Sequence, residues 1–170
     1  DLDSITQGFQ DSDLIIVAGR PSMGKTAVCL NIALNILKFY KNPVLFFSLE
    51  MSKEQLIYRL LSNEIEITST KLKNGQLTEN DWIKLNQAIK LMSSLPLFID
   101  DTPNLSIQEI KSKTQRIIFE QNHIGLIIID YLQLMENPST NSGNRVEELS
   151  KITRALKNIA REFKVPVIVL

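Results

Sequence analysis

The chain has 170 residues, the length of a single domain, and 44% of them are apolar, which is enough to build a hydrophobic core. Its 19 basic and 19 acidic side chains cancel, so no overall positive field attracts it to nucleic acid or to an anionic membrane. The single cysteine, Cys29, excludes an internal disulfide, and no apolar run approaches the roughly 20 residues that span a bilayer. We therefore predict a globular protein without membrane association, whose contacts with DNA are local or assembled from several copies.

The first strong signal along the chain is a phosphate-binding loop. The apolar run 14–18 predicts a strand, residues 27–37 have the apolar spacing of a helix, and the segment between them matches the P-loop pattern G-x-x-x-x-G-K-[ST]. In such a loop, backbone N–H groups and the helix N-terminus surround phosphate oxygens, so we expect Lys25 to reach the β- and γ-phosphates of ATP and the Thr26 hydroxyl to bind Mg²⁺. The alternative is an ordinary strand-to-helix turn that contains glycines. The predicted nucleotide-binding residues are Gly19, Arg20, Pro21, Ser22, Met23, Gly24, Lys25 and Thr26.

The next segments alternate between strands and helices. The helix after the P-loop ends at about Tyr40, where Lys41, Asn42 and Pro43 break it, and the apolar run 44–49 predicts a strand that ends at Glu50. Ser52 and Gln55 have the spacing of a capping box and begin a helix, whereas 68–77 is predicted to be a loop or short turn. Thr78 begins another helix, which carries the apolar stripe Trp82, Leu85, Ile89 and Met92, and Trp82 within this stripe is most simply core.

The second half repeats this alternation. The segment 97–99 predicts a short strand that ends in Asp100 and Asp101, and 126–129 predicts the most apolar strand, which ends in Asp130. Helices are expected from Ser106 and over 145–163, a mobile segment over 136–144, and a final strand over 165–170. Five strands alternating with helices predict an α/β fold, an open, mostly parallel sheet with helices on both faces. Ligands bind at the carboxyl ends of such strands, where the P-loop and these acidic residues would meet.

Three acidic positions compete for chemical roles. Asp130 fits the Walker B pattern of a strand-end carboxylate that binds Mg²⁺, although an aspartate that caps the next turn explains it too. Glu50 is the candidate to orient the attacking water; otherwise it is a charge placed favourably before the helix that begins at Ser52. On composition alone the pair Asp100 and Asp101 competes for that role, but the turn that follows accounts for them.

The remaining polar candidates favour structural roles. His123, the only histidine, has no second histidine or cysteine with which to share a metal and is interpreted as a helix-end residue. Cys29 is interpreted as a small buried hydrophobe. Five basic residues at helical spacing near the end of the chain indicate a solvated face, with nucleic-acid binding as the alternative: Lys151, Arg154, Lys157, Arg161 and Lys164.

Several motifs in this order resemble the DnaB-type replicative DNA helicases, in their RecA-like C-terminal motor domain. They are the segments 13–26, F-F-S-L-E-M-S at 46–52, I-D-D-T-P at 99–103, I-I-I-D-Y-L-Q-L-M at 127–135 and the helix from Arg145. The resemblance implies a homo-hexameric ring that uses ATP and Mg²⁺ to move on single-stranded DNA and unwind the duplex at a replication fork. Carried onto this chain, Lys25 and Thr26 serve ATP and Mg²⁺, Glu50 is the catalytic carboxylate, and Asp130 is the Walker B residue.

The resemblance also bounds the domain. Because the chain begins at Asp1 and ends in an apolar run, we expect 1–170 to be a single RecA-like ATPase domain truncated at both ends, without the family's collar domain, DNA-binding loop and arginine finger. Primase and a helicase loader are the implied partners of the full-length protein, in the bacterial cytoplasm (nucleoid) or the plastid stroma. Two alternatives stay open: another RecA-like ATPase without unwinding activity, and a nucleotide-binding interaction module that has lost hydrolysis.

Overall fold

The computed structural model describes residues 8–20, 22–130 and 145–170. Its strands form one sheet in the order β1-β5-β4-β2-β3, in which every neighbouring pair is parallel. The strands are β1 (Leu14–Ile16), β2 (Val44–Ser48), β3 (Leu97–Asp100), β4 (Leu126–Asp130) and β5 (Val167–Val169). The helices are α2 (Lys25–Asn35) with its π-helical extension η1 (Ile36–Tyr40), α3 (Lys53–Ile65), α4 (Ser69–Lys73), α5 (Glu79–Ser93), α6 (Ile107–Gln121) and α7 (Arg145–Phe163).

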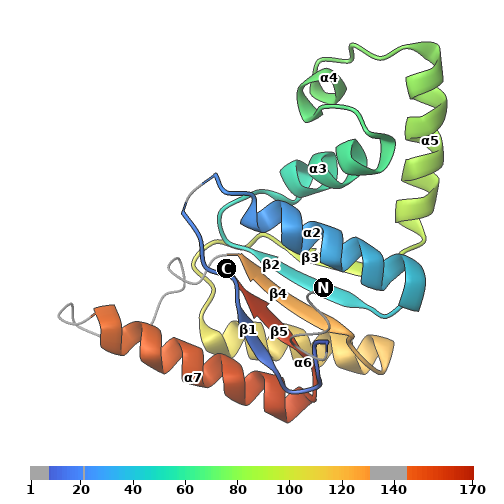
Figure 1. Ribbon diagram of the computed structural model, residues 1–170. Helices are drawn as coiled ribbons and strands as arrows, with labels where there is room; N and C mark the ends of the chain where they lie inside the picture. Colours follow the sequence, from blue (N-terminus) through green and yellow to red (C-terminus); the bar gives the residue numbers. More distant parts are fainter. Residues whose placement is uncertain (1–7, 21, 131–144) are drawn as a thin grey trace.

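Helices cover both faces of the sheet (Figure 1). On one face, α2 and α3 pack on Phe46 and Ile128. On the other face, α6 and α7 pack on Phe47 and Ile129, the next residues along the same strands. Successive side chains of a strand point to opposite faces, so β2 and β4 are buried on both sides and read as continuous apolar runs. The predicted α/β fold with a parallel sheet is confirmed.

Between β2 and β3 the chain leaves the sheet and forms a small bundle of α3, α4 and α5, which stands to one side in Figure 1. The prediction of a loop over 68–77 is wrong in part, because α4 lies within it and the Thr68 hydroxyl caps that helix by accepting from Lys71 N. The prediction that Trp82 is core is also wrong, since it is 50% exposed, and Ile89 of the same stripe is 47% exposed. The bundle buries only a narrow side of α5, the one that carries Leu85 and Ala88.

Local sequence signals set the starts of three helices. The capping boxes of α3 and α6 form as predicted, and α5 has one as well, in which Thr78 and Asp81 exchange hydrogen bonds. Helix α7 has its predicted bounds, while 136–144 lies outside the described residues. Within the described ranges, no helix combines the length and apolarity needed to cross a membrane.

Candidate nucleotide-binding site

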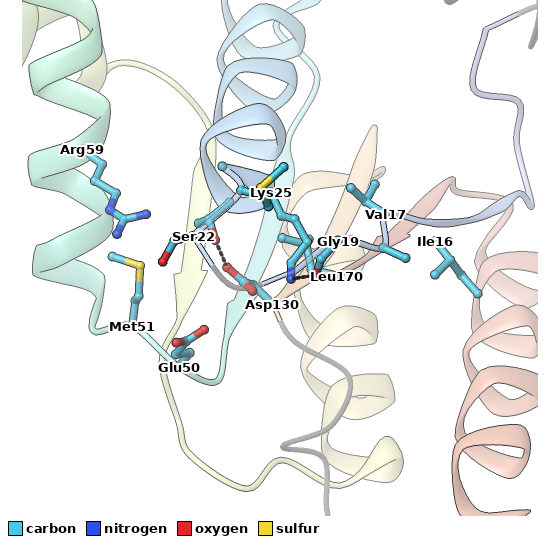
Figure 2. Close-up of a pocket in the computed structure, with 14 residues that line it drawn as sticks. Ile16, Val17, Gly19, Ser22, Lys25, Glu50, Met51, Arg59, Asp130 and Leu170 are labelled. Carbon is cyan, nitrogen blue, oxygen red and sulfur yellow. Dashed lines mark hydrogen bonds between the residues drawn. The ribbon is translucent and has the colours of Figure 1, made fainter. Parts of the chain in front are cut away.

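A pocket of about 800 Å³ opens at the carboxyl edge of the sheet. Elements far apart in the chain build its walls: the end of β1 and the loop after it, the start of α2, the turn between β2 and α3, and the ends of β4 and β5 (Figure 2). Most of the predicted site residues line it. The lining consists of Ile16, Val17, Ala18, Gly19, Ser22, Met23, Gly24, Lys25, Thr26, Glu50, Met51, Arg59, Asp130 and Leu170. Of the predicted loop residues, Arg20 does not line it, and Pro21 lies outside the described residues.

The start of α2 differs from the starts of the neighbouring helices. Its N-cap is Gly24, with φ 85° and ψ 16°, a left-handed conformation that a residue without Cβ adopts at little cost. No described side chain caps α2, and its first turn holds no acidic residue, whereas α3, α5 and α6 have both. The first N–H groups of α2 are therefore left without side-chain partners at the start of a helix that borders the pocket. Together with the positive end of the helix dipole, they suit a phosphate group.

Lys25 lies back across the loop. Its Nζ donates to the carbonyl oxygen of Gly19 at 2.6 Å, and the stem of the side chain lies beside Gly19, where an added Cβ would meet Lys25 Cγ and Cδ at 3.5 Å (Figure 2). This bond uses one of the three ammonium protons. The Lys25 side chain therefore crosses the loop, and its ammonium group can donate further hydrogen bonds.

Asp130 is the most buried polar group of the pocket, with 2% of its surface exposed. The pKa of its carboxyl lies above the usual value. Burial is the largest cause; the hydrogen bond from Thr26 lowers the pKa in part, and the charge of Glu50 raises it further. The Thr26 hydroxyl donates to Asp130 Oδ2 at 2.7 Å. A desolvated carboxylate beside a hydroxyl is a pair of hard oxygen donors, and such donors suit Mg²⁺. Among the described residues no group of three or more His, Cys, Asp or Glu side chains is placed to hold a metal. A magnesium ion here would use Thr26, Asp130 and oxygens of the nucleotide.

Glu50 lies across the pocket from Lys25 (Figure 2). It follows the end of β2 at the level of Asp130, because Ser48 pairs with Asp130 in the sheet. Among the described residues, Glu50 makes no hydrogen bond to the α3 N-terminus, while its alternative role as a charge placed favourably before that helix stays a prediction. The hydrogen bonds at the start of α3 come from Ser52, Gln55 and Asp101.

Asp100 and Asp101 lie beside this edge but do not line the pocket. Asp100 accepts from Lys113 Nζ at 2.6 Å and from Thr102 N at 3.0 Å. Burial pushes its pKa upward, but the hydrogen bonds from Lys113 and Thr102 outweigh burial, and the pKa lies below the usual value. Asp101 accepts from Lys53 N at 3.0 Å. Both carboxylates thus have structural partners, in agreement with the interpretation drawn from the turn that follows them.

One charged residue of the pocket, Arg59, was missed in the sequence. It comes from α3, and its guanidinium points toward the pocket in Figure 2. Its charge lowers the pKa of Asp130. Its position in the sequence offered one indication. Arg59 lies about two helical turns after Ser52 and directly before the buried Leu60, so it lies next to the packed side of a helix that starts at the pocket.

Other polar candidates lie away from the pocket. His123 Nε2 is 3.3 Å from Asn42 Oδ1 at the opposite edge of the sheet. Cys29 is fully buried, and burial, with a smaller effect from the charge of Asp130, raises its pKa to about 12. The five basic residues named from the sequence near the end of the chain are exposed: Lys151, Arg154, Lys157, Arg161 and Lys164. Of these, Lys157 donates to Ser12 O at 2.8 Å and pairs with Asp13 at 3.8 Å.

The architecture is that of a RecA-like P-loop ATPase: a parallel sheet with helices on both faces and a phosphate-binding loop at its carboxyl edge. A solved structure described as the RadB recombinase has this fold, with a TM-score of 0.51 at 20% identity over 99% of this chain and 65% of that one. Two others match far better, each with a TM-score of 0.92 and 37% identity over 99% of this chain. One is described as an ATPase domain and is covered over 60% of its length, and the other is a DnaB-like replicative helicase described with its interactions with primase, covered over 41%.

The family model described as the DnaB-like helicase C terminal domain matches residues 1–170, and the chain belongs to that family. It is 70% identical to a probable replicative DNA helicase of Trieres chinensis and 58% identical to the replicative DNA helicase DnaB of Nostoc sp.. All of this chain is covered in both comparisons, but it spans only 37% and 19% of the length of those relatives. The resemblance seen in the sequence motifs is confirmed.

Proposed function

We propose that this chain is the ATP-hydrolysing motor of a replicative DNA helicase, which uses ATP and Mg²⁺ to move along single-stranded DNA and separate the duplex at a replication fork. One observation carries the proposal: Lys25, Thr26, Glu50 and Asp130 line a single pocket around an uncapped helix N-terminus. The family of the chain and the similarity to proteins named replicative DNA helicases support it further.

The binding step uses the loop and its lysine. The N–H groups at the start of α2 surround the β-phosphate, and Lys25 exchanges its bond to the Gly19 carbonyl for oxygens of the β- and γ-phosphates. Thr26 and Asp130, which are joined by a hydrogen bond of 2.7 Å, would hold Mg²⁺. When bound, Mg²⁺ would supply positive charge that offsets the negative charge of the phosphate groups. The remaining steps belong to side chains of the protein.

The hydrolytic step requires a water molecule in line with the bond to the γ-phosphate. Glu50 lies across the pocket from Lys25, where it orients this water and accepts its proton. Arg59 adds positive charge on the same side of the pocket. We expect a neighbouring subunit of a homo-hexamer to add an arginine that stabilises the transferring phosphoryl group, a contribution of about 10³ to 10⁵ in rate where such an arginine is known. An isolated copy should therefore hydrolyse ATP poorly.

The partners and location follow from the same proposal. Single-stranded DNA would pass through the ring, and primase and a helicase loader would bind other parts of the full-length protein. A structure similar to this chain is described as a DnaB-like replicative helicase with its interactions with primase, which supports primase as a partner. The relatives come from bacteria and from plastid-bearing algae, which supports the bacterial cytoplasm or the plastid stroma. We further propose that residues 1–170 form one ATPase domain of a longer protein.

The test compares ATP hydrolysis by the full-length protein with and without single-stranded DNA, for the wild type, Glu50→Gln and a matched control, Glu54→Gln. Glu54 is an exposed carboxylate in the first turn of α3 that does not line the pocket. We expect DNA to stimulate the wild type and the control alike, while Glu50→Gln still binds ATP but turns it over about 10² to 10⁴ times more slowly.

Strand displacement on a forked DNA substrate separates a helicase from another RecA-like ATPase. A wild type that hydrolyses ATP without opening the fork would contradict the helicase proposal. A Glu50→Gln variant with normal turnover would assign the water-orienting role to another residue.

A further inference from the structure

We propose that Asp101, which does not line the nucleotide pocket, is a positioning residue for ATP hydrolysis because it fixes the turn that carries Glu50. The inference rests on the proposed function of the pocket. It starts from the I-D-D-T-P segment at 99–103, whose acidic pair the reaction itself does not use.

Asp101 connects two elements that are far apart in the chain. It follows the last residue of β3, and its Oδ2 accepts a hydrogen bond from the backbone N–H of Lys53 at 3.0 Å. Lys53 is the first residue of α3, and its N–H has no acceptor within that helix. The Ser52 and Gln55 capping box serves the neighbouring N–H groups, so Asp101 completes the cap from outside. Its negative charge also lies at the positive end of the α3 dipole.

The backbone on the other side of Glu50 is equally well held. Leu49 N donates to the carbonyl oxygen of Asp130 at 2.6 Å, which ties the start of the turn to β4. The Ser48 hydroxyl donates to Met51 O at 2.6 Å and accepts from Met51 N at 3.3 Å, which closes the turn on itself. Glu50 is therefore an exposed side chain on a turn that β4 fixes from one side and Asp101 fixes from the other.

Asp101 is itself held in place. The preceding residue, Asp100, accepts from Lys113 of α6 and from Thr102 N, and Lys113 also donates to the Thr102 hydroxyl at 2.9 Å. The end of β3 is thus anchored to α6, and from this anchor Asp101 reaches α3. The two carboxylates therefore have different roles: Asp100 fixes the end of β3, and Asp101 fixes the start of α3.

The consequence for the reaction follows from geometry. Without Asp101 the first turn of α3 loses a cap, and the turn before it can move relative to the P-loop. Displacement of a catalytic group by about 1 Å can cost about a hundredfold in rate. The phosphate-binding residues lie on a different element, the start of α2, so nucleotide affinity should change little. Loss of Asp101 should therefore lower kcat and spare nucleotide binding.

The experiment measures kcat, KM for ATP, affinity for a fluorescent ADP analogue and melting temperature of the full-length protein. Asp101→Ala should lower kcat about ten- to a hundredfold and change ADP affinity less than about threefold. Asp101→Asn keeps a side-chain oxygen that can accept from Lys53 N, and kcat should stay within about threefold of the wild type. This rescue by the amide separates placement of the turn from a need for the charge.

The matched control is Asp81→Ala. Asp81 Oδ2 accepts from Thr78 N at 3.0 Å at the start of α5, so its loss also removes a carboxylate from a helix N-terminus, but in the bundle away from the pocket. It should lower the melting temperature as Asp101→Ala does and leave kcat unchanged. Asp101→Ala with wild-type kcat, or an equal fall of kcat in both variants, would overturn the inference.

If Asp101→Ala does not fold, Asp101→Glu tests the same point, since the longer side chain keeps a carboxylate but displaces the oxygen that accepts from Lys53 N. A kcat of Asp101→Glu about fivefold or more below that of Asp101→Asn supports the inference, and equal kcat values overturn it. Failure of the proposed function looks different. In that case the wild type itself shows no DNA-stimulated hydrolysis or no effect of Glu50→Gln, whatever Asp101 does.

Discussion

Replacing Gly125 by alanine should destabilise the domain, although its backbone conformation is open to any residue. Gly125 precedes β4, and its N–H donates to the Pro43 carbonyl at 2.8 Å, which holds the chain before β2 against the chain before β4. A Cβ added at Gly125 would lie 2.5 Å from Asn42 Cβ and 3.3 Å from Asn42 Cγ and Nδ2. The Cβ of Asn42 cannot rotate away, so the backbone of one segment has to move.

The size of the effect follows from the overlap. Ordinary contact begins at 3.4 Å, so the segments must separate by about 0.9 Å, the difference between 3.4 and 2.5 Å. Overpacking of this kind costs about 1–3 kcal/mol. A Gly→Ala change at an unstrained site without a clash does the opposite and stabilises by about 0.4–1 kcal/mol, through the unfolded chain. The two effects oppose each other, so we expect a net loss of about 1.3 kcal/mol and a melting temperature lower by about 3–5 °C.

The assay is thermal melting of wild type, Gly125→Ala, Asn42→Gly and the double variant, at fixed protein and nucleotide concentration. Asn42→Gly removes the atoms that clash, so in its presence Gly125→Ala should stabilise by about 0.4–1 kcal/mol, and the cycle should show a coupling of about 2 kcal/mol, the contribution of the clash. A Gly125→Ala protein that melts at or above the wild-type temperature would refute the reasoning, because the sign depends on the contact with Asn42 alone.

Two more predictions concern titrating groups. With its pKa raised to about 12, Cys29 at pH 8 should react with iodoacetamide about a thousandfold more slowly than a thiol of pKa 9.0, as measured by mass spectrometry of its peptide; labelling at the rate of a free thiol would contradict its burial. The folded pKa of Asp100 is lowered, so its contribution to stability is present above the unfolded pKa of about 3.9 and is lost as pH falls through the folded value. Lys113→Met should therefore lower the free energy of unfolding by about 0.5 kcal/mol at pH 7, a value reduced by solvent screening. In urea denaturation, the difference in unfolding free energy between this variant and the wild type should become smaller below about pH 4. A gap that is constant with pH would exclude the ion pair as its cause.

Much of the fold could be predicted because its signals are local. The continuous apolar runs of β2 and β4 reflect burial on both faces, and the capping spacings of α3 and α6 are read within a few residues. The order of the strands has no such signal. β5 lies between β1 and β4, its neighbours in space, yet it comes last in the described chain. Alternation of strands and helices predicts the class of sheet and leaves the order open.

The errors arise where the structure depends on more than the periodicity of one helix, which describes one side of that helix and not what covers it. Trp82 lies on an apolar stripe, but the bundle is too small to bury it. Helix α4 is too short for periodicity, and its only local signal was the Thr68 cap. Arg59 looked like an ordinary exposed charge, because its place beside the pocket depends on how α3 packs on the sheet. The roles of the site residues stay predictions, while their meeting at one edge is an observation.

The contact between Thr26 and Asp130 shows how apolar packing sets the polar site. The strands that lead to them, β1 and β4, are not neighbours, because β5 separates them. Helix α2 bridges that gap: its buried residues, Cys29 and Leu30 among them, pack in the same cluster as Ile128 of β4 and Ile168 of β5. The first turn of α2 is thereby held above the end of β4, and the Thr26 hydroxyl comes within 2.7 Å of Asp130. Lys25 and Thr26 are adjacent at the start of this helix, so the packing that places one also places the other. The core beneath α2 therefore supports the proposed site, since it fixes the distance between the loop that would bind phosphate and the carboxylate that would bind the metal.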